Sequence, residues 1–229
     1  MEKAELKRNV DAVLSRVKAA AERRAERVGV LPTVTVVAAT KTQSPELIND
    51  IIDCGITAVG ENRVQELTAK YDGVKGADWH FIGTLQSNKA KYLVGKVSLI
   101  QSVSSGKTAV EIQRLCEKRG IIQDVLAEVN VGEEPSKTGI LPQNLDALIG
   151  GMEKLESLRL RGLMAVMPRE AEARLYDKLY ELYRRYASVT FNVLSVGMSG
   201  DYETAIEHGS NMVRIGTGFF GERKTLRSM

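Results

Sequence analysis

The fold of this 229-residue chain is decided by the stretch FNVLSVGMSGDYETAIEHGSNMVRIGTG at residues 191–218. Two short apolar runs, at 191–196 and 212–215, flank a helical pattern at 201–208, and a glycine-containing turn follows each run. This order predicts a strand, a helix and a second strand parallel to the first, which is the repeating unit of α/β proteins.

The same alternation extends toward the N-terminus. Six more strands are expected at 34–39, 57–60, 79–82, 97–101, 124–129 and 160–165. Helices between them are expected at 44–55, 61–70, 86–94, 105–119, 142–155 and 170–187. Eight strands in 229 residues leave about 29 residues per unit, the size of one βα repeat. The pattern therefore predicts one domain over 1–229, a (β/α)8 TIM barrel at about 33–226 with an extra N-terminal helix at about 2–28.

An open, dinucleotide-binding sheet is the competing architecture. It requires a GxGxxG turn after the first strand, and here that turn reads Thr40-Lys41-Thr42-Gln43. The closed barrel is therefore favoured over the open sheet.

Composition narrows the classes of function. Lys and Arg number 32 against 29 Asp and Glu, a net charge of +3 without a long basic block, so nucleic acid is not an expected partner. Cys54 and Cys116 lack CxxC spacing, which argues against a disulfide framework and a metal site. No apolar run approaches the ~18 residues of a membrane span, and acidic residues interrupt the basic N-terminus. We expect a cytoplasmic protein without a membrane partner.

Chemistry in such a barrel is built where the strands end. The last two strands end in Gly197-Met198-Ser199-Gly200 and Gly216-Thr217-Gly218, each leading toward a helical segment. Glycine turns with free backbone N–H groups and a hydroxyl suit a phosphate. The turns predict a phosphorylated ligand.

Lys41 follows the apolar run Val36 to Ala39, with only Thr40 between them. Partial desolvation there would free its amine to attack an aldehyde, so a Schiff-base lysine is one interpretation and a plain surface lysine the other. Pairing with the two phosphate turns favours the Schiff base.

Two further polar residues interrupt apolar strands. Arg214 in MVRIG must face either a ligand or a carboxylate such as Glu61, because a buried guanidinium without a partner is costly. His80 in WHFIG is either a core histidine bonded to backbone or a residue of the site.

These residues lie within segments that resemble the pyridoxal phosphate homeostasis proteins, relatives of the alanine racemase barrel. The resemblance covers nearly the whole chain. Its segments are VAATKTQSPELI, AVGENRVQEL, WHFIGTLQSNKAKYL, SVSS, EVNVGEEPSKTG, RGLMAVMP and LSVGMSGDYETAIEHGSNMVRIGTGFFGER. The fold it implies is the barrel of type III enzymes that use pyridoxal 5'-phosphate (PLP).

The resemblance also implies roles for individual residues. Lys41 matches the lysine that holds PLP as a Schiff base, and Arg214 matches an arginine that faces the pyridine nitrogen. The residues expected to cradle the phosphate are Ser199, Gly200, Gly216 and Thr217. Those expected to line the ring or its substituents are Asn62, His80 and Met198.

The chain departs from the family pattern at two places. The phosphate turn reads MSGD, where many relatives have a second polar residue in place of Gly200, and the stretch after RGLMAVMP is short. We expect the first to move one contact from a side chain to the backbone and the second to trim a loop.

Arginine only donates hydrogen bonds, so an arginine facing the pyridine nitrogen keeps that nitrogen unprotonated and the ring a poor electron sink. The chain also ends at Met229, soon after the last strand, with no expected domain to supply a second base. We therefore expect a carrier rather than an enzyme, acting in intracellular PLP (vitamin B6) homeostasis with PLP-dependent apoenzymes as candidate partners. The lack of an obvious unpaired apolar face predicts a monomer. The alternatives are a weak PLP-dependent amino-acid racemase or decarboxylase and a phosphosugar-binding barrel without a Schiff base. Lys137, after the fifth strand, is the other lysine expected on this face.

Overall fold

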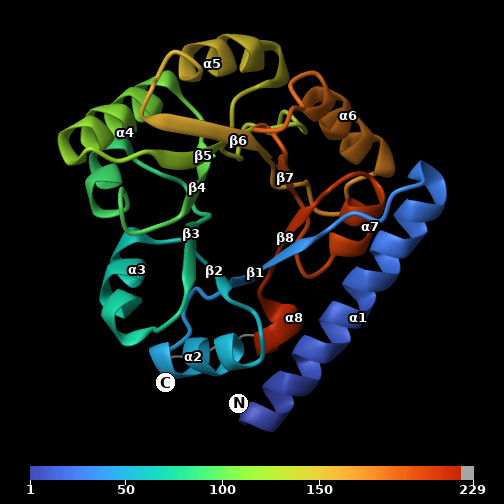
Figure 1. Cartoon of the computed structure of the whole chain (residues 1–229). Coiled ribbons are helices and arrows are strands. Elements are labelled where there is room, and N and C mark those ends of the chain that lie inside the picture. Colours follow the sequence, from blue (N-terminus) through green and yellow to red (C-terminus); the bar gives the residue numbers. More distant parts are fainter. Residues whose placement is uncertain (223–229) are drawn as a thin grey trace.

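Eight parallel strands close into a barrel in the computed structural model, which describes residues 1–222 (Figure 1). Each strand pairs with the next in the chain, and the last pairs with the first through the register Val37 to Arg214. The strands are β1 (Thr35–Ala39), β2 (Ala58–Glu61), β3 (Asp78–Phe81), β4 (Leu99–Val103), β5 (Gln123–Glu128), β6 (Leu158–Met164), β7 (Val193–Ser195) and β8 (Met212–Ile215). The barrel predicted from the alternation is confirmed, and the final residues of its expected range, 223–226, lie outside the described residues.

Helices surround the strands. They are α1 (Lys3–Val28), α2 (Pro45–Asp53), α3 (Val64–Lys70), α4 (Gly106–Arg119), α5 (Leu145–Met152), α6 (Ala173–Arg184), α7 (Tyr202–Glu207) and α8 (Thr217–Phe220). Three short 3₁₀ helices complete the ring: η1 (Tyr71–Gly73), η2 (Ser87–Tyr92) and η3 (Pro142–Asn144).

Four expected helices differ from the sequence prediction. The one at 142–155 begins as η3 and the one at 170–187 shortens to Ala173–Arg184. The segment expected to be a helix at 86–94 forms only η2, a 3₁₀ helix. The helix expected from residue 61 begins at Val64, because Glu61 is still the last, fully buried residue of β2. In these segments the spacing of apolar residues indicates which side chains are buried. That spacing does not determine the type of helix or the residue at which it begins.

The N-terminal helix packs along the outside of the barrel against α7 and α8, next to the place where β8 meets β1 (Figure 1). Its buried stripe consists of Leu6, Val10, Val13, Val17, Ala20 and Ala21. Leu14, an apolar residue next to Val13 in this helix, is 37% exposed and lies off the stripe. No helix within residues 1–222 has both the length and the apolar character that a membrane crossing needs.

The barrel interior changes character along its axis. A small apolar cluster inside it consists of Val37, Ala58, Leu99, Leu126, Met164 and Met212. Two residues further along their strands come Gln101, Glu128 and Arg214, which are buried and face inward as well because side chains alternate along a strand. This polar layer lies just below the carboxyl ends of the strands, where the site is expected.

Candidate functional site

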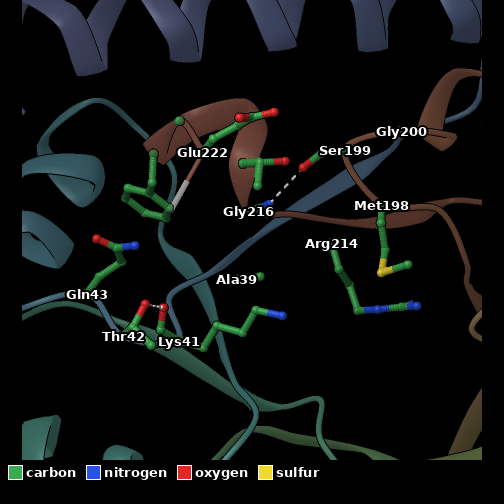
Figure 2. A pocket seen from close by; sticks show the side chains of 13 residues that line it. Ala39, Lys41, Thr42, Gln43, Met198, Ser199, Gly200, Arg214, Gly216 and Glu222 are labelled. Atoms are coloured by element: carbon green, nitrogen blue, oxygen red, sulfur yellow. Dashed lines mark hydrogen bonds between the residues drawn. The ribbon is translucent and has the colours of Figure 1, made fainter. Parts of the chain in front are cut away.

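An open pocket of about 550 Å³ lies at the carboxyl ends of β1, β7 and β8 (Figure 2). Its lining residues are Ala39, Lys41, Thr42, Gln43, Met198, Ser199, Gly200, Arg214, Gly216, Thr217, Phe220, Gly221 and Glu222. Seven of the nine residues singled out from the sequence are among them, and the other two are Asn62 and His80. Closure of the barrel produces this grouping, since it places β1 beside β8.

Lys41 reaches into this pocket from the end of β1 (Figure 2). Its side chain is exposed, so the partial desolvation expected from the preceding apolar run is wrong. That run is buried, but Lys41 stands two residues beyond the last strand position, at the open mouth of the barrel.

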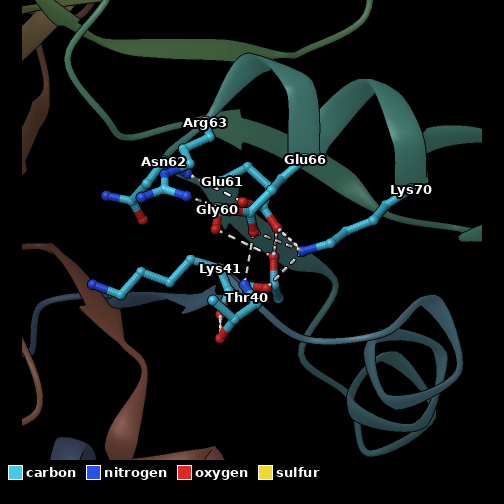
Figure 3. Close-up of polar contacts among 9 residues, drawn as sticks. Thr40, Lys41, Gly60, Glu61, Asn62, Arg63, Glu66 and Lys70 are labelled. Carbon is cyan, nitrogen blue, oxygen red and sulfur yellow. Dashed lines mark hydrogen bonds and ion pairs between the residues drawn. The ribbon is translucent and has the colours of Figure 1, made fainter. Parts of the chain in front are cut away.

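The backbone on both sides of Lys41 is held by α3 (Figure 3). Before it, the carbonyl of Thr40 accepts a hydrogen bond of 3.1 Å from Lys70 Nζ. After it, the amide of Thr42 donates to Glu66 Oε2 at 2.8 Å. Thr42 has a φ of 67°, a left-handed conformation that is uncommon for a β-branched residue. These contacts hold the turn that aims the lysine.

Glu61 links this anchor to the next loop. It is fully buried, and its Oε1 lies 2.6 Å from Lys70 Nζ and accepts a hydrogen bond of 3.1 Å from Thr40 Oγ1. Its second oxygen accepts from the amide of Asn62 at 3.2 Å. Burial raises the pKa of the Glu61 carboxyl, and Lys70 opposes the shift. Glu61 is therefore engaged here and is not the partner that the sequence analysis considered for Arg214.

Asn62 and His80 lie outside the pocket lining. The Asn62 side chain extends on the same side as that of Lys41 (Figure 3), and its buried Oδ1 has no hydrogen-bond partner among the described residues. His80 is only 3% exposed, deep in the barrel, where Gln101 and Asp78 are its partners. The structure therefore separates His80 from the pocket residues with which the sequence grouped it.

The two glycine turns meet at one oxygen atom. Ser199 Oγ accepts a hydrogen bond from the amide of Gly216 at 3.1 Å (Figure 2) and a second one from the amide of Gly218, also at 3.1 Å. Nothing lies within 4 Å of the position that a Cβ on Gly200 would occupy, so this side of the turn is open. This contact joins the two glycine turns at the place where a phosphate is expected, and it occupies the amides of Gly216 and Gly218, which the sequence analysis expected to be free.

Arg214 forms the floor of the pocket. It is 4% exposed, and it donates from NH1 to Ser195 Oγ at 2.6 Å and from NH2 to the carbonyl of Ala165 at 2.8 Å. No carboxylate among residues 1–222 forms an ion pair with it. Burial lowers the pKa of Arg214 to about 10, although Asp201 and Glu128 oppose the shift. The guanidinium stays charged at neutral pH and keeps three of its five N–H donors for a ligand.

Several polar residues of this region were missed in the sequence. Gln101 and Ser195 interrupt the apolar strands LIQSV and VLS, the signal that drew attention to Arg214. Glu128 is 3% exposed, burial raises its pKa, and its Oε2 has no partner among the described residues. A polar residue inside a buried strand could have identified all three.

A closed barrel with a lysine beyond its first strand and glycine turns beyond its last two defines a protein of the alanine racemase barrel type. The family model "Alanine racemase, N-terminal domain" matches residues 6–224. A pyridoxal phosphate homeostasis protein of Aquifex aeolicus is 45% identical over 224 residues, covering 93% of this chain and 96% of that protein. The chain belongs to the pyridoxal phosphate homeostasis protein family.

Solved structures agree with this assignment. An unknown protein from Bifidobacterium adolescentis is 33% identical with a TM-score of 0.84, and the match covers 95% of each chain. PipY of Synechococcus elongatus, in its structure with PLP bound, is 31% identical with a TM-score of 0.75, covering 88% of this chain and 100% of that one.

Proposed function

We propose that this chain binds PLP as a Schiff base on Lys41 and takes part in PLP homeostasis as a carrier rather than as an enzyme. The observation that carries the proposal is that one pocket is lined both by Lys41 and by the two glycine turns, through Ser199, Gly200, Gly216 and Thr217. PLP supplies the two groups that such a pocket suits, an aldehyde for the amine and a phosphate for the backbone donors. Its presence in the homologous PipY structure supports the assignment.

The residues around the pocket fit this ligand. Gly200 and Thr217 extend the phosphate site on either side of Ser199, and Arg214 donates to the pyridine nitrogen from below. Met198, 41% exposed at the rim, covers one side of the ring. Asn62 offers its buried, unpartnered Oδ1 to a ring substituent from the loop next to Lys41.

The charge of Arg214 favours a carrier. With a pKa of about 10 it is protonated at neutral pH, so the pyridine nitrogen facing it must be an acceptor without its own proton. Such a ring withdraws electrons weakly, which suppresses carbanion chemistry but leaves the exchange of an aldehyde between amines possible.

The second candidate is a weak racemase or decarboxylase of amino acids, which the match to the racemase family model favours. Long incubation of the PLP-loaded protein with single amino acids, followed by chiral chromatography, separates the two. Turnover well above that of free PLP would establish the enzyme, and none would support the carrier.

The proposed attachment point is tested by Lys41→Ala. Because the side chain is exposed beyond β1, thermal stability should be unchanged while the absorbance of the bound form and its reduction by borohydride disappear. Lys137→Ala is the matched control, since Lys137 lines a neighbouring pocket that also contains Met198 and Gly200. A reducible adduct that persists in Lys41→Ala but is lost in Lys137→Ala would move the attachment to Lys137. Absence of any adduct in the unmodified protein would favour a phosphosugar-type barrel.

A further inference from the structure

Five side chains form a continuous line of hydrogen bonds through the barrel interior, away from the pocket. Arg214 NH1 donates to Ser195 Oγ at 2.6 Å, and Ser195 Oγ donates to Gln101 Oε1 at 2.7 Å. The amide nitrogen of Gln101 lies 2.9 Å from His80 Nδ1, and His80 Nε2 lies 3.3 Å from Asp78 Oδ2. The line begins on the pocket floor and ends at the first residue of β3, at the opposite end of the barrel.

The chemistry of the two ends determines the direction of every bond. Arg214 can only donate, and an ionised Asp78 can only accept. The hydrogen bond with His80 lowers the pKa of Asp78, which favours the carboxylate. With each group passing one hydrogen toward Asp78, Gln101 turns its oxygen to Ser195 and its nitrogen to His80, and His80 carries its proton on Nε2. Every link is satisfied in this arrangement.

The central links of the line are closed off from water, whereas the Asp78 side chain at its end is half exposed. Gln101 and Ser195 are fully buried and His80 is 3% exposed, next to the apolar cluster inside the barrel. A buried donor or acceptor that loses its partner bears the full cost of desolvation, so each link resists rotation of its neighbours. Rotation of the guanidinium would break the bond to Ser195 and the bond to Ala165 together.

We propose that Gln101 and His80 are positioning residues that act through Ser195 to aim the remaining N–H donors of Arg214 at the pyridine nitrogen of the ligand. The inference rests on the proposed function, since it assumes that PLP is the ligand and that its nitrogen faces Arg214. It assigns His80 a role at a distance, in place of the contact with the ring that the sequence predicted.

The test uses two ligands that differ at one atom, PLP and its 1-deaza analogue, in which a C–H group replaces the pyridine nitrogen. The full chain should bind PLP about tenfold or more tightly than the analogue, because a hydrogen bond to a charged donor is lost. Gln101→Leu removes both central links and should reduce this preference at least about threefold through weaker binding of PLP, leaving the affinity for the analogue nearly unchanged.

Gln123→Leu is the matched control. Gln123 is also buried, at 3% exposure, but it bonds to the backbone of Val97 and Ser98 rather than to this line. It should leave the preference intact even where it lowers thermal stability. In an Arg214→Met background, Gln101→Leu should not change the preference for PLP over the analogue any further, because the guanidinium that the line positions is absent. Ser195→Ala, a smaller change, provides the same measurement if Gln101→Leu does not fold.

The proposal is overturned if Gln101→Leu and Ser195→Ala weaken both ligands equally, or if Gln123→Leu alters the preference as much. It is also overturned if the unmodified protein binds PLP without preferring it over the analogue, which would leave PLP binding itself standing. Absence of any reducible PLP adduct would instead refute the proposed function.

Discussion

Replacing Lys70 with methionine should destabilise the protein far more than the loss of an ordinary surface lysine. The Lys70 side chain is 11% exposed, and its amine lies 2.6 Å from Glu61, which is fully buried. Methionine retains most of the side-chain volume and removes the cation, so Glu61 is left without its counter-charge. Breaking a buried pair in this way costs about 3–5 kcal/mol of unfolding free energy.

The loss of unfolding free energy in Lys70→Met should depend on pH in a defined direction. Burial already raises the pKa of Glu61 in the folded protein, and removing Lys70 raises it further. A carboxyl with a raised folded pKa contributes stability below its unfolded pKa and loses it as pH rises through the folded value. The deficit of Lys70→Met relative to the unmodified protein should therefore be smaller at about pH 5 than at about pH 8.

Urea denaturation followed by far-ultraviolet circular dichroism measures both effects, provided that the m-value is unchanged. Lys7→Met is the matched control, because Lys7 pairs with Asp11 at 2.5 Å with both side chains more than half exposed, and solvent screens such a pair so that its loss should be small. The double variant Glu61→Gln with Lys70→Met should recover part of the loss. A deficit for Lys70→Met no larger than that for Lys7→Met, or one that grows toward acid pH, would refute the argument.

Three further outcomes are expected. Ser199→Ala combined with Thr217→Val should weaken PLP by about 2–4 kcal/mol in a binding titration and weaken pyridoxal, which lacks the phosphate, much less; equal weakening would place the phosphate elsewhere. Gly162→Ala should destabilise the barrel by about 3 kcal/mol or more in urea, because Gly162 has a φ of 153° and an added Cβ would lie 1.7 Å from the carbonyl oxygen of Val193. A loss of unfolding free energy below about 1 kcal/mol for Gly162→Ala would contradict this, because it would mean that β6 and β7 move apart to accommodate the added Cβ at little cost. Ser105→Ala should cost about 1 kcal/mol by removing the N-terminal cap of α4, with no change in PLP affinity.

The sequence was most informative where one short segment determines its own structure. The helix expected at 44–55 forms as α2, where Ser44 accepts the amide of Leu47 at its start and Gly55 follows its end with a φ of 98°, as these residue types favour. Lys41 and the turns at Ser199 and Gly216 were recognisable because the end of an apolar run marks the end of a strand. Local chemistry alone was less reliable at 86–94, where the same apolar spacing led to a 3₁₀ helix.

By itself, the sequence determined the number and order of the strands, the position of the lysine and the composition of the phosphate turns, because all of these depend on neighbours in the chain. Only the tertiary structure decided which polar groups meet. Pairing of β8 with β1 places Lys41 and Arg214 in the same pocket. Glu61 pairs with Lys70, and Arg214 donates to Ser195 instead of to that carboxylate. Side chains from different strands share the barrel interior, and their partners there depend on register and strand alternation, which no single segment encodes.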